Sequence, residues 1–303
     1  MSLLDRNDIE PPRLRHTSKG HKPSSPPVPR EVLSLIASFG PRQHRLLAPG
    51  PLSLRQVVER ARPHVWTRLG ESSVRTMATV EKVREVRERL FSEGTVLARA
   101  DGRDRELFPV SISESEGLAL RDWVQREGAV RTLETGLGFA VSTLFIFEAL
   151  LANGTKVRHV ASDPYQLSGL PTHSTTYVGS GLQILEDAGV RDLVEFYEEE
   201  SQITLPRLLA EGRQFDLAFL DGNHRFEGVL LDLVYSGRLL KEGGIVFVDD
   251  VQLPGVARAV NFCLKNLDWT SADQGGEDLH EWIVLRTGPS EAYLRPYADF
   301  VDF

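Results

Sequence analysis

Five acidic side chains stand at the ends of short apolar segments in this 303-residue sequence. They are Glu134, Asp163, Asp221, Asp249 and Asp250. Solid apolar runs are typical of parallel strands that are buried on both faces of a sheet. The carboxyl ends of such strands meet at one edge, where ligands of open α/β folds bind. One acidic residue at a strand end is common, but five at a single edge predict a ligand site.

A glycine loop follows the first apolar segment, within residues 134–143. Gly136 and Gly138 permit positive φ angles and close approach of a ligand to the backbone. Ser142 falls in the first turns of the next helix, where hydroxyls and free amides hold anionic groups. The dinucleotide fingerprint fails at Val141, and no lysine follows the glycines as a P-loop requires. A tight turn without a ligand is the alternative, but the loop suits a ligand with an adenosine and no pyrophosphate.

Alternating strands and helices must position these residues. We predict apolar strands at 129–133, 156–162, 193–197, 215–220, 245–248 and 281–285. Helices are predicted at 115–127, after the glycine loop to 151, and at 181–188, 204–210, 226–240 and 256–267. This alternation is typical of the α/β class with a doubly wound, mostly parallel sheet.

The chain divides into three predicted parts. Residues 1–30 are rich in proline and read as a disordered tail. Residues 31–111 contain amphipathic stretches and read as a helical extension, either a packing appendage or a lid over the site. Residues 112–303 carry the alternating pattern and form the predicted α/β domain.

Composition narrows the function classes. The chain has 35 basic and 43 acidic residues and a formal net charge of −8, which disfavours binding to a phosphate backbone. Cys263 is the single cysteine, so intrachain disulfides and cysteine-rich zinc modules are excluded. No apolar run is long enough for a membrane helix, and the N-terminus lacks a signal-peptide pattern. We therefore expect a cytoplasmic protein without a nucleic-acid or membrane partner.

Four motifs carry a resemblance to a known family. They are the run Leu-Glu-Thr-Gly-Leu-Gly at 133–138, the segment at 189–201, the run at 215–232 that contains Asp-Gly-Asn-His, and the run at 240–250 that ends in Asp-Asp. In this order they resemble the class I S-adenosylmethionine-dependent methyltransferases, and most closely their small-molecule O-methyltransferase-like branch. The resemblance covers residues 112–286 and implies a Rossmann-like, seven-stranded sheet.

The resemblance implies a role for each matching position. It places Glu134, Gly136 and Gly138 along the methionine part of the cofactor, Ser142 near its carboxylate, Asp163 at the ribose, and Glu200 and Ser201 at the adenine. Asp221 is also counted among the cofactor-binding residues. The segment departs from the family at Glu199-Glu200, where Gly-Asp or Gly-Ser is usual. For Asp163, capping of the turn at Pro164 is the alternative role.

The resemblance also implies acid–base and metal chemistry. Catechol-type members bind a divalent metal through acidic residues after the fourth and fifth strands, and Asp221, Asp249 and Asp250 stand at those positions. Oxygen ligands of this kind suit Mg²⁺. His224 lies three residues after Asp221, at the spacing of the family's general base, and an imidazole takes protons near neutral pH. The alternatives are aspartates that cap turns and a loop histidine that hydrogen-bonds to one of them.

The sequence thus predicts a methyltransferase that uses S-adenosylmethionine, with Mg²⁺ as a candidate aid, to methylate a small-molecule acceptor at a hydroxyl. The alternatives are a noncatalytic cofactor-binding module and a nucleotide-dependent oxidoreductase, against which Val141 counts. The acceptor's identity and the oligomeric state, a homo-oligomer included, are left open.

Overall fold

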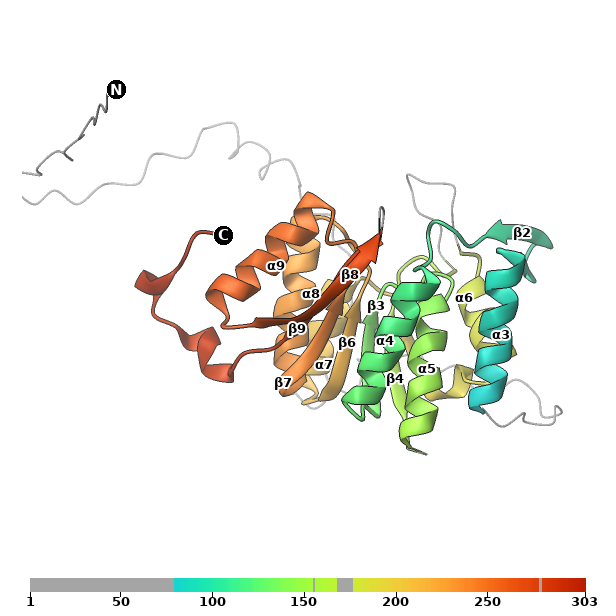
Figure 1. The fold of residues 1–303 in the computed structure, drawn as a ribbon, viewed down its shortest axis with the longest axis horizontal. Coiled ribbons are helices and arrows are strands. Elements are labelled where there is room, and N and C mark those ends of the chain that lie inside the picture. Colours follow the sequence, from blue (N-terminus) through green and yellow to red (C-terminus); the bar gives the residue numbers. More distant parts are fainter. Residues whose placement is uncertain (1–78, 155, 168–176, 278–279) are drawn as a thin grey trace, which may run out of the picture. The chain divides into compact units, whose positions relative to one another are not determined.

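A seven-stranded sheet lies at the centre of the computed structural model, which describes residues 79–154, 156–167, 177–277 and 280–303 (Figure 1). Its strand order is β5-β4-β3-β6-β7-β9-β8. The strands are β3 (Arg131–Thr135), β4 (Arg158–Ser162), β5 (Val194–Tyr197), β6 (Phe215–Leu220), β7 (Leu240–Val248), β8 (Thr270–Glu277) and β9 (His280–Arg286). The first five are parallel, and β9 is antiparallel to both of its neighbours. The predicted mostly parallel, Rossmann-like sheet is confirmed.

Helices cover both faces of this sheet. One layer contains α3 (Val80–Glu93), α4 (Glu114–Arg126), α5 (Val141–Asn153) and α6 (Ser180–Asp187), and the other contains α7 (Ser201–Ala210), α8 (Phe226–Leu239) and α9 (Pro254–Asn266). Short 3₁₀ turns occupy Arg191–Leu193, Ser290–Leu294 and Tyr297–Asp299. Among the helices that the structure describes, none has the length and apolar character needed to span a bilayer.

Each face of the sheet has its own apolar core. In β6, Leu217 and Phe219 pack into the core beneath α4 and α5, whereas Ala218 and Leu220 pack into the core beneath α8 and α9. Side chains alternate across a strand, so a strand between two helical layers needs apolar residues at every position. This explains why the apolar runs of the sequence matched the central strands closely.

Two strand pairings escape prediction. The edge strand β8 is largely polar and contains Gly275 and Gly276, so it gives no apolar run. A two-stranded antiparallel sheet of β1 (Thr95–Ala98) and β2 (Arg103–Glu106) lies within the predicted helical extension. Its strands are short and partly charged, which conceals them from hydrophobic patterns. The domain boundaries at 30 and 111 stay predictions, and the tail and residues 31–78 lie outside the described residues.

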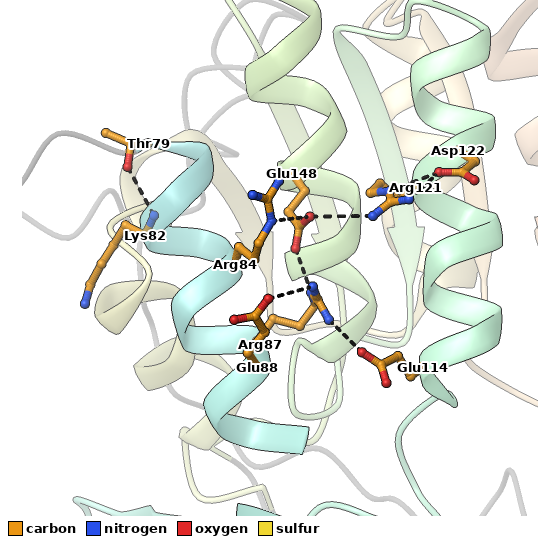
Figure 2. A network of polar contacts seen from close by, with 9 residues as sticks. All are labelled: Thr79, Lys82, Arg84, Arg87, Glu88, Glu114, Arg121, Asp122 and Glu148. Atoms are coloured by element: carbon orange, nitrogen blue, oxygen red, sulfur yellow. Dashed lines mark hydrogen bonds and ion pairs between the residues drawn. The ribbon is translucent and has the colours of Figure 1, made fainter. Parts of the chain in front are cut away.

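Helix α5 is mostly apolar and buried on all sides, and α3 packs against it. A buried ion-pair network fastens the two helices, and Figure 2 shows it centred on Glu148 of α5. Arg87 of α3 donates from Nε to Glu148 at 2.6 Å and from Nη1 to Glu114 at 3.1 Å. Arg84 and Arg121 approach Glu148 at 3.5 and 3.9 Å. Because α5 begins at the glycine loop, this network steadies one wall of the predicted site.

Candidate functional site

A cleft of about 800 Å³ opens at the carboxyl ends of β3, β4 and β6. The chain runs outward from the central β3 in both directions, to β4 on one side and to β6 on the other, so the predicted edge is also the topological switch point. The predicted site residues that line the cleft are Gly136, Gly138, Ser142, Asp163, Glu200, Ser201, Asp221 and His224. The other three, Glu134, Asp249 and Asp250, lie behind this lining.

Gly136 stands where the glycine loop touches the loop after β6. Its φ is +86°, and a Cβ built there would lie 1.8 Å from the backbone oxygen of Asp221. Gly138 has a φ of +50° and donates its N–H to Asp163 at 2.8 Å. Any side chain at Gly136 would push apart the two loops that form the floor of the cleft, which explains the glycine there.

Glu134 is fully buried and does not face the cleft. Three groups reach its carboxylate: the Ser142 hydroxyl at 2.5 Å, the Thr143 hydroxyl at 2.6 Å and Nε2 of His159 at 2.8 Å. On the far side of the imidazole ring, Nδ1 lies 2.8 Å from the Thr132 hydroxyl. The structure therefore places Glu134 within a hydrogen-bonded network that holds the first turn of α5 against the sheet.

This network fixes the hydrogen-bonding role of Ser142. A serine hydroxyl has one proton to donate. Ser142 gives that proton to Glu134, so toward the cleft its oxygen can only accept a hydrogen bond. A ligand group that binds this oxygen must be a donor, such as an ammonium. A carboxylate would have to turn to the free backbone amides at the start of α5.

Asp163 is buried at the end of β4 and lines the cleft. Its carboxylate accepts from the backbone N–H of Tyr165 at 2.7 Å, from Gly138 at 2.8 Å and from the Gln166 side chain at 3.3 Å. Burial raises the pKa of Asp163 above its ordinary value, and these donors oppose the shift. The contacts agree with the capping role, while the ribose contact stays a prediction.

Glu200 and Ser201 line the opposite end of the cleft, where α7 begins. The Glu200 side chain is exposed and accepts from Gln202, another lining residue. The Ser162 hydroxyl donates to the backbone oxygen of Glu199 at 3.0 Å and fixes this segment to the end of β4. Both predicted adenine residues are therefore in the cleft.

Asp221, His224 and Asp250 form an acidic cluster at the β6–β7 end of the cleft. Nε2 of His224 lies 3.3 Å from Asp221 and 3.1 Å from Asp250. The hydrogen bond to Asp221 raises the pKa of His224, and burial raises the pKa of Asp221 to about 8. Asp250 adopts a φ of +58° and accepts from Gln252 at 2.7 Å. The three ligand atoms lie within 4.8 Å of one another, as the donors of one cation would.

Asp249 departs from the predicted set of three aspartates. It is buried and groups with Glu116 of α4 and His280 of β9, and not with Asp221 and Asp250. Its Oδ1 accepts from the backbone N–H of Asp250 at 2.6 Å. Burial raises the pKa of Asp249, and burial together with Asp249 raises the pKa of Glu116 to about 11. The tight turn at the end of β7 sends these two neighbouring side chains to different places.

Sequence reasoning missed several residues around the cleft. Glu116 lies in the predicted helix, but its position in an ordinary amphipathic pattern gives no sign that it packs against the sheet edge. Ser111 and Ile112 line the cleft from the segment before α4, and Tyr177 lines it beside the ring of Phe139, at a centroid distance of 5.0 Å. The N-cap serine at 113 is the one signal that would have placed this segment next to a helix start.

Comparisons with known proteins agree with this geometry. Residues 133–251, less than half of the chain, match the family model described as a methyltransferase domain. No protein of curated function matches the sequence closely enough to count as a relative. Among solved structures, the O-methyltransferase TomG from Streptomyces achromogenes, involved in tomaymycin synthesis and crystallised with SAM, is 20% identical. The match covers 69% of this chain and 90% of that chain, with a TM-score of 0.52.

An O-methyltransferase from Bacillus cereus, in complex with SAH, is 17% identical over 69% of this chain and 91% of that chain, with a TM-score of 0.50. At these identities the two structures establish the fold, and the family model adds the domain type. The matched residues run from the glycine loop to the loop after β7, so they contain the predicted site. The predicted Rossmann-like fold is confirmed, and residues 133–251 carry a methyltransferase domain.

Proposed function

We propose that the protein transfers the methyl group of S-adenosylmethionine to a hydroxyl of a small molecule. The observation that carries the proposal is one cleft with two unlike ends: a glycine loop whose neighbouring carboxylates are saturated with donors, and a cluster of aspartates around His224. The first end suits a ligand made of an amino acid joined to an adenosine, such as S-adenosylmethionine. The second end suits removal of a proton from an acceptor hydroxyl. The SAM and SAH bound in the TomG and Bacillus cereus structures support the choice of donor.

The chemistry of the donor set at the glycine end fits this cofactor. The Ser142 oxygen would accept from its ammonium, and the free first-turn amides of α5 would hold its carboxylate. Gly136 and Gly138 leave room for the methionine part. Glu134 acts through Ser142 and is therefore a positioning residue. Further along the cleft, Asp163 would face the ribose, and Glu200 and Ser201 would face the adenine.

His224 is the proposed general base. When bound, the cofactor supplies a methyl group on a sulfonium, and the protein must orient the acceptor hydroxyl and remove its proton. A proton taken by His224 creates an imidazolium between Asp221 and Asp250, at 3.3 and 3.1 Å from Nε2. The two carboxylates stabilise this positive charge, so the cluster favours transfer of the acceptor hydroxyl's proton to His224.

A divalent cation such as Mg²⁺ fits the same end of the cleft. Asp221 and Asp250 would hold it, since oxygen donors suit this ion and their nearest atoms, with that of His224, lie within 4.8 Å of one another. When bound, the ion would lower the pKa of an acceptor hydroxyl. Asp249 is held by Glu116 in the opposite group, so we propose two of the three predicted aspartates as ligands in the cleft.

The acceptor is proposed to be small and not a nucleic acid. The cleft has the volume of a small-ligand pocket, and it must also hold the cofactor. The aspartates at its acceptor end repel phosphate groups, which agrees with the net charge of −8. The rings of Phe139 and Tyr177 offer an apolar surface to a flat part of either ligand.

Turnover tests this proposal. The full chain is incubated with S-adenosylmethionine and a panel of phenols, catechols and sugar alcohols, and S-adenosylhomocysteine and methylated products are detected by mass spectrometry. We expect product with at least one acceptor, a strong loss in His224→Gln, and a loss in EDTA that Mg²⁺ restores. Activity unchanged by EDTA would remove the metal, and cofactor binding without product from any acceptor would contradict the proposed reaction.

A further inference from the structure

Behind the cleft, Glu116, Asp249 and His280 come together from three elements: α4, the end of β7 and the start of β9. One ligand atom from each side chain lies within 4.8 Å of the others. Glu116 is fully buried, and no donor among the described residues reaches either of its carboxylate oxygens. A buried carboxylate without a donor is costly to a fold, so the position requires either a proton on the carboxyl group or a cation beside it.

Neighbouring charges increase this requirement. Asp249 lies beside Glu116, and Asp249, Asp221 and Asp250 all repel a negative charge on it. His224 lies between Asp221 and Asp250 and serves the cleft, so His280 is the basic side chain that belongs to this group. Two buried carboxyl groups in contact cannot both ionise unless a proton or a metal cation lies between them.

His280 distinguishes the two explanations. A proton shared by two carboxyl groups needs no third side chain, but an imidazole in the same group completes a set of metal ligands. Nδ1 of His280 is buried and has no hydrogen-bond partner among the described residues. Two carboxylates and one imidazole are donors that first-row transition metals accept, whereas Mg²⁺ prefers oxygen ligands and keeps several waters.

We propose that Glu116, Asp249 and His280 bind a divalent first-row transition metal such as Zn²⁺, at a site separate from the cleft. Two carboxylates and a neutral imidazole would balance the charge of such an ion. The cation would tie α4 to the sheet edge and fix the turn in which Asp250 follows Asp249 with its φ of +58°. The inference does not depend on the proposed methyl transfer, because the site holds no residue that lines the cleft.

Metal titration of the full chain tests the site. Protein stripped with chelator is titrated with Zn²⁺, Co²⁺ and Mg²⁺ in parallel, with calorimetry, thermal melting and, for Co²⁺, the visible absorption spectrum as readouts. The cleft cluster can also take a divalent ion, so the titration is repeated in His224→Gln, which removes one of its ligand atoms. We expect the same tightly bound equivalent of Zn²⁺ in both proteins, with a raised Tm. Co²⁺ should give d–d bands, and Mg²⁺ should bind more weakly.

Glu116→Gln is the decisive variant, because glutamine imitates a protonated glutamate and can donate to Asp249. We expect Zn²⁺ affinity to fall at least tenfold and the Co²⁺ bands to disappear. His280→Asn, at a partly exposed position, should give the same loss if Glu116→Gln does not fold. Three results would overturn the site: no Zn²⁺ binding by the parent chain, Zn²⁺ binding kept in both variants, or binding lost only in His224→Gln. If the parent chain binds no Zn²⁺ and Glu116→Gln folds, Glu116 and Asp249 share a proton instead of a metal ion.

Discussion

The two ends of the cleft treat buried carboxylates in opposite ways. Near β3 and β4, Glu134 receives three donors and Asp163 receives two backbone N–H groups and an amide. Near β6 and β7, Asp221 shares His224 with Asp250, and behind the cleft Glu116 has no donor among the described residues. The first end is complete before any ligand arrives, whereas the second has an excess of negative charge.

The difference indicates what each end is built to accept. A saturated network offers rigid backbone amides and oriented oxygens, so it binds a ligand by shape and by a few directed hydrogen bonds. An excess of carboxylates favours protons and cations, because each added positive charge relieves repulsion. The proposed functions follow this division: the cofactor binds at the saturated end, and proton removal and metal binding occur at the acidic end.

Substitution of Gly136 should have the largest effect on the saturated end. In Gly136→Ala the new Cβ would meet the Asp221 backbone oxygen, and the two loops would separate. We expect S-adenosylmethionine binding, measured by calorimetry, to weaken more than about 100-fold. Gly128→Ala is the matched control: its φ is also positive, at +59°, but nothing lies within 4 Å of the new Cβ. It should leave the affinity unchanged, and equal losses in both variants would refute the close-approach argument.

At the acidic end, His224→Gln should lower kcat by about 100-fold or more, the usual share of a general base, and should change the cofactor affinity little. Glutamine retains a polar side chain between Asp221 and Asp250 but takes no proton. Steady-state kinetics with the best acceptor measures the effect. A kcat within threefold of the parent value would remove His224 from the base role.

The Arg87–Glu148 pair shows what a buried carboxylate requires when its partner is a cation. Arg87→Ala leaves Glu148 buried with two more distant arginines, so we expect a loss of about 3 kcal/mol in unfolding free energy. Urea denaturation measures it. Arg103→Ala, on the exposed strand β2, is the control and should change stability by less than about 0.5 kcal/mol. A similar result for both variants would show that the network in Figure 2 does not hold α3 in place.

The smallest expected effect concerns Asp232 of α8 and the way in which stability depends on pH. It is buried, one of its oxygens has no hydrogen-bond partner among the described residues, and burial raises its pKa to about 6. Because the folded state holds this proton more tightly than the unfolded state, the stabilisation is present below pH 4 and is lost as pH rises through 6. We expect Asp232→Asn to gain about 1 to 3 kcal/mol at pH 8 and little at pH 4, measured by urea denaturation at both values.

A second aspartate is the control for this effect. Asp216 is also buried, but it accepts from the backbone N–H groups of Val130 and Arg131 at 3.0 and 2.9 Å. Asp216→Asn replaces a charged acceptor of two N–H groups, so it should lose about 1 to 2 kcal/mol at pH 8. A loss in Asp232→Asn at pH 8 would contradict the assigned cost of its buried charge.

The sequence was sufficient for the sheet and for most of the cleft, for a physical reason. Strands between two helical layers must be apolar throughout, so runs such as 215–220 mark both the strand and the acidic residue that follows it. A polar strand at the edge of a sheet has no apolar run in its sequence, and β8 was missed for this reason. The hairpin of β1 and β2 was missed for the same reason.

Side-chain direction could not be read from sequence. Asp249 and Asp250 are adjacent and chemically identical, yet the turn sends one toward Glu116 and the other toward His224. The resemblance treats both as ligands of one ion. Likewise, Glu134 stands at a position expected to face the cofactor, but buried donors on α5 and β4 turn it inward. These choices depend on tertiary partners far away in the chain.

Calorimetric titration with S-adenosylmethionine and, in parallel, NADH, each with and without Mg²⁺, tests which ligand the cleft binds. We predict micromolar binding of S-adenosylmethionine in both conditions, because the cofactor end is complete without the metal, and no binding of NADH. A folded protein that binds NADH, or that fails to bind S-adenosylmethionine in either condition, would contradict the assignment of this cleft to methyl transfer.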